Sequence, residues 1–143
     1  MAEIMLIEND SILADLIQLS IEQKGHQVTW HADEANALAA FKKKRPDLIV
    51  LDLFLPQTDT LALIRQLQET SDRRIPPAVI VLSALGYSEV IEAALKAGAA
   101  DYLLKPLNPD VLLERVQILL SQREKTTRKG GRTISKPQFR RIR

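Results

Sequence analysis

The chain has 143 residues, of which 45% are hydrophobic and 27% are charged, and it contains no cysteine. This length suits one domain with a single hydrophobic core, and the composition is ordinary for a soluble globular protein. The lack of cysteine excludes disulfides, thiol catalysis and thiolate metal sites. The N-terminus shows no signal-peptide pattern, and no apolar run approaches the roughly 20 residues of a membrane span. We therefore expect a cytoplasmic protein without a membrane segment.

The charge is distributed unevenly along the chain. Residues 1–122 hold 11 Lys and Arg against 17 Asp and Glu, a net charge of −6, whereas residues 123–143 hold nine against one, a net charge of +8. The second stretch also contains Gly-Gly, Pro, Ser and Thr and loses the apolar periodicity. We predict a folded domain over residues 1–122 and a basic flexible tail or linker over residues 123–143. Such a tail suits a link to an output domain, contact with nucleic-acid phosphates, or a latch on the acidic domain.

Strand-like and helix-like segments alternate from the start of the chain. Ile4–Ile7 is predicted to be a strand, and Asp10 or Ser11 can cap the helix that follows. The apolar residues expected to form a stripe along that helix are Ile12, Leu13, Leu16, Ile17, Leu19 and Ile21. Gln27–His31 suits an edge strand, and the alanine-rich helix after it ends before Pro46.

Two continuous apolar runs, Leu48–Leu51 and Val79–Leu82, predict strands buried on both faces. The helix between them has leucine and isoleucine at helical spacing, and the next helix stops at Gly98. A last strand, Asp101–Leu104, precedes a final helix capped by Asn108. The apolar residues expected on that helix are Val111, Leu112, Val116, Ile118 and Leu119. This alternation predicts an α/β fold with five parallel strands and helices on both faces.

Polar side chains follow four of these strands. Glu8–Asp10 come after the first strand, Asp52 ends the third, Ser83 ends the fourth and Lys105 follows the fifth. In a doubly wound sheet of order 2-1-3-4-5, the first and third strands are neighbours at the switch point where ligands bind. Clustered carboxylates need a cation, and Mg²⁺ prefers such oxygen ligands. Together with a Lys and a Ser, this set suits the acceptance of a phosphoryl group.

The sequences IEND, DLIVLDLFLP, VIVLSA and ADYLLKP occur in the order and spacing of a known family. Over about residues 3–122 the chain resembles the response-regulator receiver domains of two-component signalling, in the CheY-like superfamily. The resemblance implies a flavodoxin-like fold and identifies Asp52 as the acceptor of a phosphoryl group from a sensor histidine kinase or phosphotransfer protein. It implies a phosphorylation switch, not a turnover enzyme, in which only aspartyl phosphorylation and dephosphorylation are self-catalysed.

The same resemblance assigns roles to individual residues. The implied Mg²⁺ ligands are Glu8, Asn9, Asp52 and the main-chain carbonyl of Phe54. Ser83 and Lys105 would contact the phosphoryl group, and Ser83 and Tyr102 would change position between two states. Lys105-Pro106 would be a cis peptide bond, which X-Pro bonds adopt at small cost.

Two positions depart from the family pattern. Asn9 stands where the family has an acidic metal ligand, so we expect weaker Mg²⁺ binding and slower phosphorylation. The segment Gln57–Thr60 has no glycine where the family commonly has one or two, so this loop is expected to be stiffer or differently turned.

Other functions remain open from the sequence. The strongest alternative is a pseudo-receiver, a phosphorylation-independent protein-interaction module with a decayed metal site at Asn9. A flavin or nucleotide binder is disfavoured because the turns lack a Gly-rich phosphate loop. Expected partners are the kinase and a downstream effector or output domain. A homodimer through the face of the fourth and fifth helices is a further alternative.

Overall fold

Five parallel strands form the centre of the computed structural model, which describes residues 1–69 and 74–128. The strands are β1 (Glu3–Ile7), β2 (Gln27–His31), β3 (Leu48–Asp52), β4 (Ala78–Ser83) and β5 (Asp101–Leu104). Their order is β2-β1-β3-β4-β5, and every neighbouring pair is parallel. The predicted flavodoxin-like sheet is therefore confirmed.

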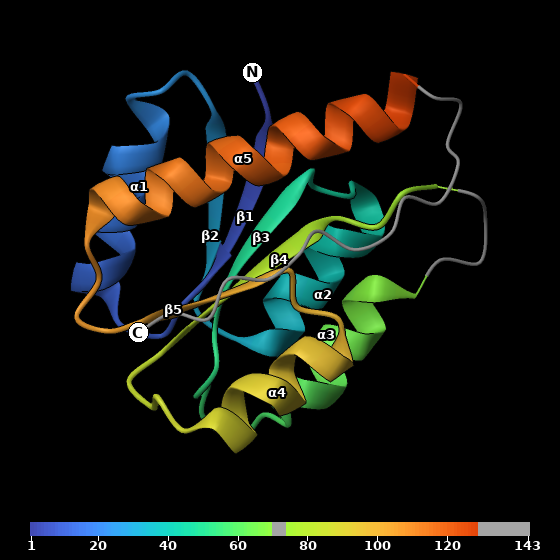
Figure 1. Cartoon of the computed structure of the whole chain (residues 1–143). Helices are drawn as coiled ribbons and strands as arrows, with labels where there is room; N and C mark the ends of the chain where they lie inside the picture. Colours follow the sequence, from blue (N-terminus) through green and yellow to red (C-terminus); the bar gives the residue numbers. More distant parts are fainter. Residues whose placement is uncertain (70–73, 129–143) are drawn as a thin grey trace.

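Helices cover both faces of the sheet. They are α1 (Ser11–Glu22), α2 (Glu34–Lys43), α3 (Thr60–Gln68), α4 (Ser88–Ala97) and α5 (Pro109–Arg128). Figure 1 shows α1 and α5 on one face and α2, α3 and α4 on the other. This arrangement of helices around a parallel sheet buries the strands from both sides.

The core consists of two apolar layers, one on each face of the sheet. Every residue of β3 is buried, as the unalternating apolar run predicts. Ile49 and Leu51 belong to the layer under α2, α3 and α4, whereas Leu48 and Val50 belong to the layer under α1 and α5. The strand is thus held from both sides, which fixes the position of Asp52 at its end.

Asp10 and Gly98 define the start of α1 and the end of α4. The Asp10 carboxylate accepts hydrogen bonds from the backbone N–H groups of Ile12 and Leu13, at 3.0 and 3.3 Å, confirming the predicted cap of α1. Gly98 ends α4 with a φ of 125°. A Cβ at Gly98 would lie 2.6 Å from Cγ of Gln68, so both the backbone angle and the close contact with α3 require glycine.

The expected apolar sides of α1 and α5 are only partly buried. Ile12, Leu16 and Leu19 are 81%, 43% and 62% exposed, and Val111 and Ile118 are 39% and 41% exposed. Five residues of the predicted apolar sides of these helices are therefore exposed. The fully buried residues of α1 follow a narrower stripe: Ala14, Ile17 and Ile21. A helix that packs on a flat sheet buries only such a stripe, so the remaining apolar residues face outward.

Helix α5 continues past the predicted domain boundary at residue 122. Arg123 Nη2 donates to the carbonyl of Ile75 at 2.9 Å, and Nη1 lies 3.5 Å from Oδ1 of Asp47. These contacts attach the last turns of α5 to the domain, so the secondary structure does not break at residue 122. The division into residues 1–122 and 123–143 stays a prediction, since residues 129–143 lie outside the described ranges.

Candidate functional site

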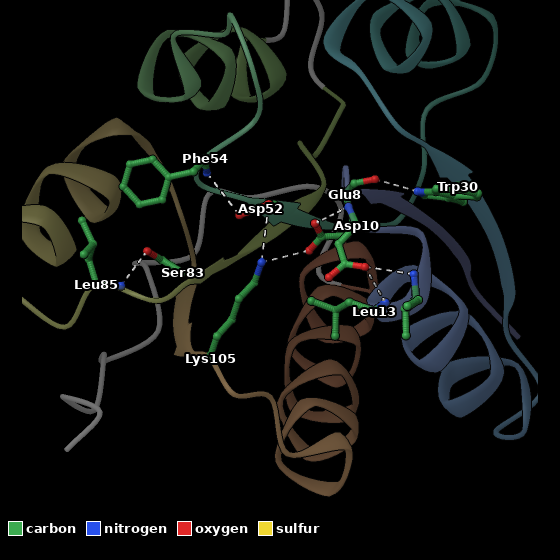
Figure 2. Close-up of polar contacts among 10 residues, drawn as sticks. Glu8, Asp10, Leu13, Trp30, Asp52, Phe54, Ser83, Leu85 and Lys105 are labelled. Carbon is green, nitrogen blue, oxygen red and sulfur yellow. Dashed lines mark hydrogen bonds and ion pairs between the residues drawn. The ribbon is translucent and has the colours of Figure 1, made fainter.

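The polar residues predicted at the strand ends meet at one edge of the sheet. Ile7 of β1 pairs with Leu51 of β3, so Glu8 and Asp52 both follow one residue later on adjacent strands. Figure 2 shows their carboxylates and the Lys105 amine pointing toward one another, with Ser83 on the next strand. Glu8, Asp52 and Ser83 are buried. The switch point of the sheet therefore carries a carboxylate pair with a lysine between its members.

Lys105 contacts both carboxylates. Its Nζ lies 3.2 Å from Oε1 of Glu8 and 3.5 Å from Oδ2 of Asp52. The main chain of Lys105 is fixed by an N–H donated to the carbonyl of Ser83 at 2.8 Å, and the predicted cis peptide bond to Pro106 is present. Sequence reasoning predicted Lys105 at this edge but did not predict its pairing with Glu8.

The remaining carboxylate oxygens are held by the backbone. Asp52 Oδ1 accepts the N–H of Phe54 at 3.1 Å, and Glu8 Oε2 accepts the N–H of Asp10 at 3.1 Å. Glu8 Oε1 is buried and has no hydrogen-bond donor among the described residues, because Lys105 lies within ion-pair distance but outside hydrogen-bonding geometry. Among these oxygens, Glu8 Oε1 is thus left for a further positive ligand.

The environment of Glu8 disfavours its charged form. Burial raises the pKa of Glu8, and the nearby Asp52 carboxylate raises it further, whereas the N–H of Asp10 and the charge of Lys105 lower it. A carboxylate in such a position gains stability from an added cation. The negative charge at this edge is therefore only partly compensated by Lys105.

The donor set suits a hard cation such as Mg²⁺, which takes oxygen ligands. Two carboxylates, from Glu8 and Asp52, lie at the site, and Asn9 is exposed beside them. In the described ranges, no cluster of three Asp, Glu or His side chains could hold a metal. A metal here would therefore need neutral oxygens, such as the Asn9 amide and the Phe54 carbonyl, in addition to the two carboxylates.

Ser83 and Tyr102 both contact the loop that follows β4. The Ser83 hydroxyl accepts the N–H of Leu85 at 3.0 Å, and the Tyr102 hydroxyl donates to the carbonyl of Leu85 at 2.7 Å. Tyr102 is fully buried, and this burial raises its pKa, with the Ser83 hydroxyl acting in the opposite direction. The two predicted switch residues are thus joined through one loop residue.

Two features of the site were not predicted. The indole Nε1 of Trp30 donates to the main-chain carbonyl of Glu8 at 2.8 Å. The position of Trp30 near the end of β2, the neighbour of β1, was the only sequence signal for this contact. Gln57, in the loop after Asp52, has a φ of 55°, so a residue with a side chain occupies the left-handed conformation that favours glycine.

Comparison with known proteins identifies the family. The model of the response regulator receiver domain matches residues 4–117. The transcriptional regulatory protein CseB of Streptomyces avermitilis is 35% identical over 117 residues, which are 82% of this chain and 48% of that protein. The DNA-binding dual master transcriptional regulator RpaA of a Synechocystis species is 32% identical, over 87% of this chain and 52% of RpaA. The chain therefore spans about half the length of these relatives.

Solved structures agree with this comparison. The receiver domain of the Francisella response regulator 1452 has a TM-score of 0.78 and 32% identity, over 86% of this chain and 99% of that one. The BeF3-activated receiver domain of Klebsiella pneumoniae RstA has a TM-score of 0.73 and 28% identity, over 82% of this chain and 97% of that one. In the described part of the chain, no helix combines the length and apolarity needed to span a bilayer. The chain belongs to the response regulator receiver domain family.

Proposed function

We propose that this domain accepts a phosphoryl group on Asp52 from a sensor histidine kinase or phosphotransfer protein in the cytoplasm. The observation that carries the proposal is the position of Lys105 Nζ, 3.2 Å from Glu8 and 3.5 Å from Asp52. The Asp52 side chain is 10% exposed, so a donor can reach its carboxylate at the edge of the sheet while the neighbouring residues hold it in place. A nucleophilic carboxylate beside a fixed cation is what phosphoryl acceptance requires.

The proposed transfer is a single displacement. An Asp52 carboxylate oxygen attacks the phosphorus of a donor phosphohistidine, the P–N bond breaks, and its electron pair stays on the imidazole nitrogen. Lys105 then pairs with the phosphoryl oxygens, and the Ser83 hydroxyl turns from Leu85 to donate to one of them. Hydrolysis of the acyl phosphate restores the carboxylate and releases inorganic phosphate.

The same site would hold Mg²⁺ through Glu8, Asp52, the Asn9 amide and the Phe54 carbonyl. Bound there, the ion would neutralise charge on the phosphoryl oxygens. The buried Glu8 Oε1, which lacks a hydrogen-bond donor among the described residues, supports this assignment. Asn9 contributes no charge, so the protein must bind the ion with two carboxylates where the family pattern has a further acidic ligand.

The proposed switch runs through the loop at Leu85. When the Ser83 hydroxyl moves to the phosphoryl group, the Leu85 N–H loses its acceptor. The hydrogen bond from Tyr102 to the Leu85 carbonyl then remains to hold the loop. The phosphoryl group adds about −1.5 to −2 charges at neutral pH. If the phosphoryl group contacts Ser83 and Lys105 more strongly in one conformation of the loop than in the other, it would shift the equilibrium toward that conformation. A downstream effector or output domain would bind one of them.

An apolar surface beside the site supports a protein partner as donor. Ile12, Leu16 and Leu19 are exposed at positions i, i+4 and i+7 of α1, which begins at Ser11, three residues after Glu8. Exposed apolar patches of this kind mark interaction surfaces. We infer that the kinase docks on this face of α1, next to Asp52.

Intact-mass spectrometry with Mg²⁺ and acetyl phosphate tests the proposal. We expect the protein to gain one phosphoryl group and the Asp52→Asn variant to gain none. Beryllofluoride, the mimic bound in the RstA relative, should shift the backbone NMR signals of Ser83 to Tyr87 in the parent only. A folded parent that stays unmodified by acetyl phosphate and by a phosphorylated histidine donor would contradict the proposal.

Such an outcome would favour the pseudo-receiver function. Its supporting observation is Asn9, which leaves two carboxylates at the site. In that case the surface formed by α4, β5 and α5 would bind a partner, or a second copy of the chain, without phosphorylation. Beryllofluoride would then leave the spectra of this surface unchanged.

A further inference from the structure

A basic cavity lies at the opposite end of the sheet from Asp52. Its volume is about 810 Å³. The cationic residues that line it are Lys42, Lys43, Lys44, Arg45, Arg74 and Arg123. Among the described residues of the lining, the one carboxylate is Asp47, so the cavity carries a net charge of about +5. Residues 1–122 have a net charge of −6, so this surface opposes the charge of its own domain.

The cations come from separate segments that the fold brings together. Lys42 and Lys43 end α2, Arg45 leads into β3, and Arg74 precedes β4. Arg123 lies in α5, where its contacts with the Ile75 carbonyl and with Asp47 hold it against the domain. These positions are up to about 80 residues apart in the chain, so their convergence is a property of the tertiary structure.

Arg45 is held in place and retains hydrogen-bonding capacity. Its guanidinium lies 5.2 Å from the centroid of the Phe41 ring, and its Nη2 donates to the Glu69 carbonyl at 3.4 Å. Its Nη1 is buried without an acceptor in the described part of the chain. A buried donor without an acceptor costs free energy, so an incoming oxygen ligand at this position would be stabilising.

The helix dipole does not account for this charge. The C-terminus of α2 is equivalent to about −0.5 of an elementary charge, which Lys42 alone would compensate. Arg74 and Arg123 lie outside α2. Of the three lysines, Lys44 pairs with Glu3 at 3.2 Å, whereas Lys42 and Lys43 make no ion pair with the described residues. Lys42 and Lys43 are therefore the lysines of the cavity whose charge is not paired with the described residues and is open to a ligand.

We propose that the basic cavity binds a compact polyphosphate, a ligand with two or more linked phosphate groups such as a nucleoside triphosphate or inorganic tripolyphosphate. Its volume falls within the roughly 300–1,000 Å³ of small-molecule sites. Arginine and lysine side chains that converge from several segments match the closely spaced oxygens of linked phosphates. A concave site favours such a compact ligand over a nucleic-acid backbone, which follows an extended surface.

Isothermal titration calorimetry of the full chain in EDTA, with sodium tripolyphosphate, tests the proposal. We expect saturable binding at one site per chain. Lys43→Glu should weaken it about tenfold, since reversing an exposed charge removes one attraction and adds one repulsion. The matched control is Lys96→Glu, because Lys96 is exposed in the last turn of α4 and does not line the cavity. This control should bind as tightly as the parent.

Further measurements distinguish a nucleotide from a simple phosphate chain as ligand, and the basic cavity from the site at Asp52. Tighter binding of ATP than of tripolyphosphate would assign the cavity to a nucleotide, and equal binding would assign it to the phosphate chain. Asp52→Asn should bind as the parent does, so the proposal stands or fails independently of phosphorylation. Equal weakening by Lys43→Glu and Lys96→Glu, a lack of saturation, or tighter binding of a DNA duplex than of tripolyphosphate would overturn the proposal.

Discussion

The indole N–H of Trp30 donates a hydrogen bond to the carbonyl oxygen of Glu8 at 2.8 Å. Trp30 is the single tryptophan of the chain. Its indole therefore contacts the backbone of a residue whose side chain belongs to the carboxylate pair. A cation that draws the Glu8 side chain toward itself would move this carbonyl, and the fluorescence of Trp30 would report the change.

The first prediction concerns Mg²⁺. We expect Mg²⁺ to change Trp30 fluorescence, and we expect Asn9→Asp to lower the dissociation constant about tenfold, because a charged ligand replaces a neutral one. Asn108→Asp is the matched control, since it adds the same charge near this edge and preserves the cap of α5. If both variants strengthen binding equally, Asn9 is not a ligand.

The second prediction concerns docking of the kinase on α1. Ile12→Ala, at a side chain that is 81% exposed, should slow phosphotransfer from a kinase by about tenfold or less, as expected when one contact at an interface is lost. It should leave the reaction with acetyl phosphate unchanged. Ile118→Ala on α5 is the control. Equal loss with both donors would mean that the substitution disturbs the site itself.

The third prediction concerns the pH dependence of stability. Burial raises the pKa of Glu8 above 4.5, so the folded state binds this proton more tightly than the unfolded state does. Stability is then lost as pH rises from about 4.5 through the folded pKa. Glu8→Gln removes this loss and should raise the free energy of unfolding at pH 7.

At pH 4, parent and Glu8→Gln should have similar free energies of unfolding, because this pH lies below the Glu8 pKa of both the unfolded and the folded state. Urea unfolding at both pH values, in EDTA, measures the difference. Glu22→Gln, at an exposed position that ends α1, provides the control and should change little. A Glu8→Gln variant that is less stable at pH 7 would show that the pairing with Lys105 outweighs the cost of burial.

The fourth prediction concerns the loop after Asp52. Gln57 has a φ of 55°, which costs a residue with a Cβ about 1 kcal/mol more than glycine. We expect Gln57→Gly to raise the free energy of unfolding by up to about that amount. The same substitution at Gln66, exposed inside α3, should lower it by about 1 kcal/mol. Destabilisation at both positions would contradict the prediction.

The fifth prediction concerns the hydrogen bond between Tyr102 and Leu85. Tyr102→Phe leaves the Leu85 carbonyl without this donor and should cost roughly 1 kcal/mol of stability. Hydrogen exchange of the loop after Ser83 should become faster. Tyr87→Phe is the matched control, since Tyr87 is 64% exposed. Unchanged exchange in Tyr102→Phe would show that this bond does not hold the loop.

The sequence predicted the features that depend on local pattern. The unalternating run before Asp52 identified a strand buried on both faces, and the alternation of strands and helices identified a parallel sheet covered on both faces. It also predicted the cap at Asp10, whereas the strand order and the cis bond before Pro106 followed from the family resemblance. The buried strand, the alternation and the cap depend on neighbouring residues, through the hydrophobic pattern or through local hydrogen bonds.

The features that were missed depend on tertiary placement. Apolar periodicity shows which side of α1 is hydrophobic, but the width of the stripe that the sheet covers decides that Leu19 is exposed. The pairing of Lys105 with Glu8 and the approach of Arg123 to Asp47 join distant segments. A local sequence pattern does not specify contacts between segments so far apart in the chain, so these contacts could be identified only in the folded structure.

The strand order also has a consequence for synthesis of the protein. β1 hydrogen-bonds to β2 on one side and to β3 on the other, so its second edge is satisfied only after Asp52 has left the ribosome. Until then the nascent chain presents a bare apolar strand, to which chaperones bind. Ribosome-bound chains arrested before β3 should therefore be cleaved readily by protease, whereas those that also include β4, β5 and α5 should resist it.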